Sequence, residues 1–195
     1  MSSSDLVRWG GLAGILAGVA WVVSGIVHFA MVYPQAGTGP TGSLSDYLIE
    51  SAHAVAEAGM VGALIGLRAR QGPWYGWLGT VGFAVAFLGT ALLCVITVTA
   101  IISGDALGEA VLGTIFVSGV LGWLVGFPLL GIATLRAKVL PRWCGVLLIA
   151  YFPLFGFLLA SYGWGGIALG LLWVALGYVL WSWRGSAAEQ PSRVS

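Results

Sequence analysis

The stretch WGGLAGILAGVAWVVSGIVHFAMV, residues 9–32, contains no Asp, Glu, Lys or Arg. An α-helix needs about 20 consecutive apolar residues to cross the hydrocarbon core of a bilayer. Arg8 precedes the stretch, but the apolar run is too long for a cleavable signal peptide and lacks a clear small-residue cleavage site. The stretch therefore predicts a first transmembrane helix that is retained.

Five further apolar segments follow, at residues 46–67, 75–102, 108–135, 143–162 and 165–183. Of the 195 residues, 59% are hydrophobic and only 8% are charged, whereas soluble domains carry about 25% charged residues. The sequence predicts an all-α polytopic protein with six transmembrane helices in a single domain, residues 1–184. Residues 185–195 are expected to form a polar, disordered cytoplasmic tail. The net charge of +1 argues against nucleic acid as a partner.

The charged residues separate by side if the six segments alternate in direction. Acidic residues occur at loop ends on one side, at Asp46, Glu50, Asp105 and Glu109. Basic residues in loops mark the cytoplasmic side of a membrane protein. The charge pattern therefore predicts a bacterial plasma membrane protein with both termini in the cytoplasm. All eight basic residues fall on the cytoplasmic side: Arg8, Arg68, Arg70, Arg136, Lys138, Arg142, Arg184 and Arg193.

Small residues and a weak repeat bear on how the helices pack. Four pairs of glycines with i,i+4 spacing predict close helix contacts inside the bundle rather than a dimer interface; they are Gly14/Gly18, Gly62/Gly66, Gly122/Gly126 and Gly166/Gly170. The sequence LRAR at 67–70 with Pro73 recurs as LRAK at 135–138 with Pro141. This recurrence indicates three helix-hairpin repeats, although basic residues and proline also suit any inner loop.

The second segment is the least apolar and carries Glu50, His53 and Glu57. At 100° per residue these three side chains share one helix face. Glu57 is expected about 16 Å below the membrane surface, near the midplane. A bare carboxylate there costs at least about 2.5–3.5 kcal/mol, so Glu57 must be protonated, paired or in contact with water. His28 in the first segment is expected between Glu50 and His53 in depth, so these residues together predict an outward-facing polar pocket.

Several functions are compatible with this grouping. The residues could form a polar lock that only holds helices together. Alternatively, Glu57 and His53 would titrate while the pocket binds or transports a small solute or protons. His28, Asp105 and Glu109 would then contribute to substrate binding.

A membrane enzyme acting on an isoprenoid or another lipophilic substrate is a further alternative, so enzymatic activity is left open. Glu57 or Glu50 would act as the general acid beside His53. Trp21, Trp123 and Trp173 would stabilise a cation through their rings, although packing in the apolar core is an equally ordinary role for them.

The residues offer weak support for a cofactor. Glu50-x-x-His53 matches half of a di-metal carboxylate site, but a second motif is missing, so no metal site is predicted. His28 and His53 would be able to ligate a haem in a subunit of a membrane complex. A purely structural subunit is the remaining class, and the sequence leaves the cofactor and the oligomeric state open. The lipid bilayer is the one partner that composition requires.

Three short motifs carry a family resemblance. They are WGGLAG at 9–14, ESAH at 50–53, and LRA at 135–137 with PRWCG at 141–145. With these motifs the chain resembles six-helix membrane proteins of actinobacteria and, more distantly, the DUF4386-like group, whose second helix also carries a Glu near its start. The resemblance implies a six-helix membrane fold over most of the chain and implies no activity.

Overall fold

The computed structural model describes residues 3–32, 44–72, 76–103 and 108–183. Six long helices make up these ranges, and no strand occurs within them. The prediction of an all-α, six-helix protein is therefore confirmed. The helices are α1 (Ser3–Val27), α2 (Leu44–Gln71), α3 (Gly76–Ser103), α4 (Glu109–Ala137), α5 (Arg142–Ala160) and α6 (Tyr162–Trp181), with a short π-helical segment, η1 (His28–Val32), continuing α1.

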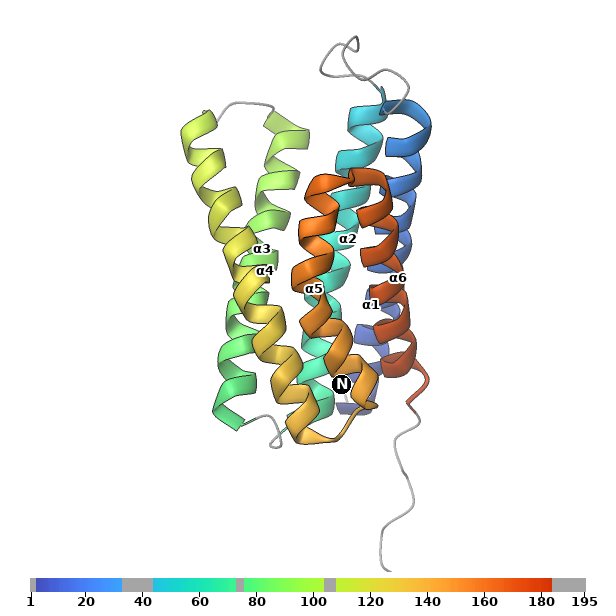
Figure 1. Ribbon diagram of the computed structural model, residues 1–195, viewed down its shortest axis with the longest axis vertical. Helices are drawn as coiled ribbons and strands as arrows, with labels where there is room; N and C mark the ends of the chain where they lie inside the picture. The colour runs from blue at the N-terminus through green and yellow to red at the C-terminus, as the bar shows by residue number, and fades with distance from the viewer. Residues whose placement is uncertain (1–2, 33–43, 73–75, 104–107, 184–195) are drawn as a thin grey trace, which may run out of the picture.

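The helices run side by side along the long axis of the molecule (Figure 1). The start of α1 and the end of α6 lie together at the lower end in this view, and the end of α1 and the start of α2 lie at the upper end. Because the chain passes along the bundle an even number of times, the first helix begins and the last helix ends at the same end of the bundle. The tail predicted at 185–195 lies outside the described residues.

Five of the six helices are long and apolar enough to cross a membrane. The exception is α5, in which the apolar stretch is shorter and covers Arg142–Phe157. All 19 residues of α5 would extend about 28 Å at 1.5 Å per residue, close to the thickness of the hydrocarbon core. The architecture is thus that of a polytopic helical membrane protein, with α5 as its shortest helix.

Large apolar side chains cover the outside of the bundle. Leu16, Leu88 and Leu171 are each about 60% exposed, at 62%, 61% and 60%. In water such a surface would aggregate, whereas in a bilayer it faces lipid. The interior buries tryptophan, tyrosine and phenylalanine side chains together with a few polar groups.

Glycines set the closest helix approaches. A Cβ atom on Gly10 of α1 would lie 2.5 Å from the Cα of Gly66 on α2. One on Gly122 of α4 would lie 2.7 Å from the Cα of Gly89 on α3. All four glycine pairs singled out in the sequence face neighbouring helices of the same chain, which confirms packing inside the bundle.

The helix pairing only partly follows the predicted hairpins. Helices α1 and α2 pack closely, and so do α3 and α4. Helix α6, however, packs along α1 more extensively than along α5, its neighbour in sequence. Duplication of a hairpin unit stays a prediction.

Candidate functional site

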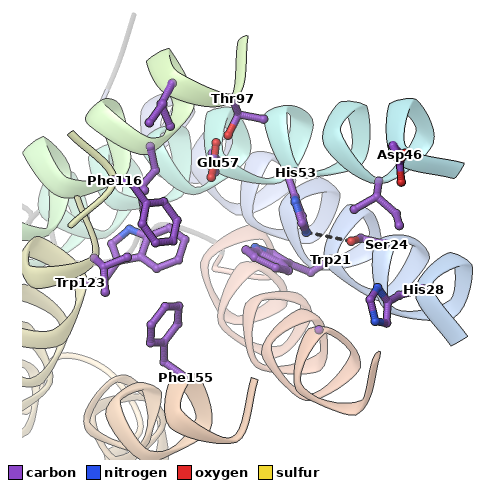
Figure 2. Close-up of a pocket in the computed structure, with 15 residues that line it drawn as sticks. Trp21, Ser24, His28, Asp46, His53, Glu57, Thr97, Phe116, Trp123 and Phe155 are labelled. Carbon is purple, nitrogen blue, oxygen red and sulfur yellow. Dashed lines mark hydrogen bonds between the residues drawn. The ribbon is translucent and has the colours of Figure 1, made fainter. Parts of the chain in front are cut away.

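A cavity of about 380 Å³ lies inside the upper half of the bundle. Small-molecule sites typically occupy about 300–1,000 Å³, so the cavity can hold a compact ligand. All six helices contribute to its wall, and Figure 2 shows side chains from several of them converging on one space. The lining residues include Trp21 and Ser24 from α1, His28 from η1, Asp46, His53 and Glu57 from α2, Thr97 from α3, Phe116 and Trp123 from α4, and Phe155 from α5.

Glu57 is the most deeply buried acidic group of the cavity. Its side chain is only 5% exposed, although it lines the cavity wall. Thr97 supplies a side-chain hydrogen bond to its carboxyl group, while the buried Oε2 atom has no hydrogen-bond partner among the described residues. A buried polar atom without a partner costs about 1–3 kcal/mol, so the site is incomplete without a further donor or cation.

His53 is held in place one helical turn above Glu57. Its Nε2 atom lies 2.8 Å from the hydroxyl oxygen of Ser24 on α1. Its ring packs against Trp21, with 4.8 Å between the ring centroids and 46° between the planes. This hydrogen bond and ring contact fix the imidazole at the cavity wall (Figure 2).

Two tryptophans form part of the cavity wall: Trp21, which lies beside His53, and Trp123. The indole N–H of Trp21 donates to the sulfur of Met60 at 3.4 Å. That of Trp123 donates to the hydroxyl of Thr90 at 2.9 Å. Because both N–H groups are already used by protein partners, the two indoles offer the cavity only ring surface.

The aromatic wall continues beyond the cavity into the core. Trp123 lies edge-on to Phe155, with centroids 5.8 Å apart, and edge-on to Tyr151 at 5.6 Å. Such contacts hold large rings in defined orientations. The wall that faces Glu57 is consequently a rigid aromatic surface.

The cavity carries acidic groups and no permanent cation among the described residues. Asp46 and Glu57 line it, and no described lysine or arginine does. The described basic residues occur instead near the lower helix ends, at Arg8, Arg68, Arg70, Arg136, Lys138 and Arg142.

Most of the residues singled out from the sequence meet at this cavity. Glu57, His53, His28, Trp21 and Trp123 all line it. Two of the three polar residues predicted to share a face of α2, His53 and Glu57, therefore lie at the cavity in the centre of the bundle.

Four other candidates are placed differently. Glu50 is not among the lining residues, because the cavity face of α2 runs through Asp46, Ile49 and His53 and leaves Glu50 at its edge. Trp173 is buried in α6 beside Phe127, away from the lining. Glu109 begins α4, but its side chain, like all of Asp105, lies outside the described residues.

Sequence reasoning did not identify Ser24, Thr97, Phe116 and Phe155 as part of the site. Serine and threonine are common in membrane helices, where they often bond to their own backbone, as Thr99 does to Val95. Phenylalanine is equally ordinary in apolar segments. Only the three-dimensional packing distinguishes these four residues from similar ones elsewhere.

The residues present do not suit a haem or a metal centre. Within the described ranges, His, Cys, Asp and Glu side chains form no group of three or more that could hold a metal ion. A porphyrin held by His53 would need space beside that ring, but Trp21 packs against the ring and Ser24 engages its Nε2 atom. A haem ligated by His28 and His53 therefore does not fit this geometry.

No family model matches the chain, and no curated protein or solved structure gives a significant match. The resemblance to actinobacterial six-helix proteins accordingly stays a prediction. What the protein does must be inferred from the cavity and its chemistry.

Proposed function

We propose that this membrane protein binds a small solute in the cavity and that Glu57 is the group that both contacts the solute and gives up a proton to water when the solute binds. The observation that carries the proposal is made at Glu57: this residue lines a 380 Å³ cavity, and its buried Oε2 atom has no hydrogen-bond partner among the described residues. A ligand that donates a hydrogen bond or carries positive charge would complete the site.

A polar lock between helices would be built differently. In a lock, both carboxyl oxygens would bond to neighbouring helices, because satisfying them is its sole role. Here Thr97 bonds to the carboxyl group, while the buried Oε2 atom has no hydrogen-bond partner among the described residues, although Glu57 lines the cavity. This arrangement favours ligand binding over pure packing.

Proton exchange follows from the depth of Glu57 in the bundle. An ionised carboxylate near mid-membrane costs several kcal/mol unless a charge or water compensates it. The titratable groups around it are His53 on α2, His28 on η1, Cys94 on α3 and Tyr151 on α5, and none is a permanent cation. In the proposed cycle the empty site carries a proton on Glu57 and releases it when the solute binds.

Transport would need a second conformation. On the side of Glu57 away from the cavity mouth, α2 buries Met60, Ala63 and Leu64 almost completely. The solute would pass this packed layer only if the helices rearranged, as in alternating access. Binding at the upper half and release at the lower end would then be two states of one site.

The orientation is also part of the proposal. We place the upper end of the bundle outside the cell, and both termini in the cytoplasm of a bacterial plasma membrane. The support is the positive-inside rule, because the described arginines and lysine are near the lower helix ends. The cavity then faces outwards, where it can collect an external solute.

A membrane enzyme acting on a lipophilic substrate is the second candidate. The observation in its favour is the ring surface of Trp21, Trp123, Phe116 and Phe155 beside a buried carboxyl group. A neutral carboxylic acid in such surroundings can protonate a substrate, and aromatic faces can stabilise the resulting cation. Conversion of an isoprenoid probe by the purified protein would favour this candidate over binding alone.

The test uses the purified full chain in lipid nanodiscs and a panel of small amines, sugars and carboxylates. We expect at least one class to raise the unfolding temperature of the wild type and of Glu50→Gln, but not of Glu57→Gln. Glu50→Gln is a matched control, since it is the same change on the same helix outside the cavity lining. If Glu57→Gln and His53→Ala lower stability but leave every ligand response unchanged, the polar lock is the better explanation.

A further inference from the structure

We infer that the solute is a lipophilic organic monocation, such as a quaternary or protonated amine that bears a compact apolar group. The inference rests on the proposed function, because it names the class of solute for the same cavity. It is carried by three independent features: the charge of the lining, the use of the indole N–H groups, and the unsatisfied oxygen of Glu57.

The charge of the lining selects against anions. Glu57 and Asp46 line the cavity, and no arginine or lysine among the described residues does. An anionic ligand would find no permanent positive charge there to pair with it. It would also have to bind near Asp46, and in surroundings of low dielectric constant repulsion by a carboxylate is screened far less than in water.

The aromatic wall selects for a cation over a neutral polar solute. The indole N–H groups of Trp21 and Trp123 already donate to Met60 and Thr90, so they cannot donate hydrogen bonds to a sugar or an amide. Their ring faces carry partial negative charge and attract cations, with tryptophan the strongest of the aromatic residues. Quaternary ammonium groups are recognised in this way because they need no hydrogen-bond acceptors.

One acidic group of the cavity has a buried oxygen that needs a partner. Thr97 bonds to the carboxyl group of Glu57, and the Oε2 atom of that group has no hydrogen-bond partner among the described residues. Asp46 already takes part in another interaction. A single positive group near Glu57 therefore completes the site, and the rest of the ligand contacts the apolar wall formed by Leu93, Ile96 and Val120.

The experiment compares three probes of nearly equal size by calorimetry on the full-length protein in nanodiscs, with empty nanodiscs subtracted. The probes are benzyltrimethylammonium, its neutral carbon isostere neopentylbenzene, and the anion phenylmethanesulfonate. We expect the cation to bind the wild type about tenfold or more tightly than the neutral isostere, which corresponds to about 1.4 kcal/mol or more. The anion should not bind measurably.

Variants assign this preference to the residues that carry it. Glu57→Gln should reduce cation affinity about tenfold or more while leaving the neutral isostere almost unaffected; Glu57→Asp, which keeps the charge, should retain the preference. Trp123→Phe and Trp123→Leu both lose the bond to Thr90, but only the phenylalanine keeps an aromatic face. Cation affinity should therefore fall further in Trp123→Leu than in Trp123→Phe.

The outcomes separate the two proposals. If the neutral isostere binds as tightly as the cation, and Glu57→Gln weakens both to the same extent, the cation inference is overturned while a solute-binding cavity that uses Glu57 stands. If none of the three probes binds the folded protein, and no amine, sugar or carboxylate of the panel raises its unfolding temperature, the proposed function itself is overturned.

Discussion

The wall formed by α3 and α4 depends on the missing side chain of Gly122. A Cβ atom at this position would lie 2.7 Å from the Cα of Gly89, 3.1 Å from the carbonyl oxygen of Val85 and 3.2 Å from the amide nitrogen of Gly89. All three are backbone atoms, so no side chain can turn aside. To reach an ordinary contact of 3.4 Å, Gly122→Ala must move the helices apart by about 0.7 Å, which we expect to cost about 1–3 kcal/mol.

The same displacement should reach the cavity. Trp123 follows Gly122 directly, and its 2.9 Å hydrogen bond to Thr90 joins the two helices that would separate. We therefore expect Gly122→Ala to lower the unfolding temperature in nanodiscs and to weaken binding of benzyltrimethylammonium.

Gly113→Ala is the matched control on the same helix. Nothing lies within 4 Å of a Cβ atom at Gly113, so this variant should be as stable as the wild type or more stable by about 0.5–1 kcal/mol. If Gly122→Ala and Gly113→Ala have the same stability, the close approach of α3 and α4 at Gly122 is refuted.

Two further predictions concern the histidine and the orientation. Ser24→Ala should lower the free energy of unfolding by about 1 kcal/mol and weaken solute binding, because it removes the hydrogen-bond partner of His53. The control Ser118→Ala loses only a bond to its own helix and should change little in a thermal-unfolding assay. Equal effects of the two changes would count against the role of Ser24. Alkaline phosphatase fused after Trp183 should be inactive in bacteria, and the same enzyme inserted in residues 33–43 should be active. The reverse pattern of activity would require the bundle to be inverted.

The helices were predictable because a segment that crosses the lipid bilayer must be a long run of apolar, uncharged residues. Every backbone polar group must bond internally in lipid, so long uncharged runs such as residues 9–32 can only be helices. The helix ends were less predictable. For example, α2 continues to Gln71, beyond the apolar run, because Arg68 and Arg70 in its last turn favour the helix end.

The ionisable residues of the site were largely predictable, whereas its hydroxyl groups and the choice of aromatic side chains were not. An acid such as Glu57 stands out in an apolar segment because it is expensive there. Trp21 and Trp123 could be named as candidates but not separated from Trp173, since all three occur deep in apolar helices. Which tryptophan lines the cavity depends on helix rotation, and rotation is set by contacts such as that between Trp123 and Thr90.

The extensive contact between α1 and α6 has a consequence for how the protein is made. Helix α1 is synthesised first, yet one of its two major partners enters the membrane only after α2, α3, α4 and α5. Until then the face of α1 that includes Gly11 and Gly18, which packs against α6, lacks its permanent neighbour. Biogenesis should therefore pass through a half-assembled state in which lipids or an insertion chaperone shield that face, and degradation should act mainly on chains stalled before α6.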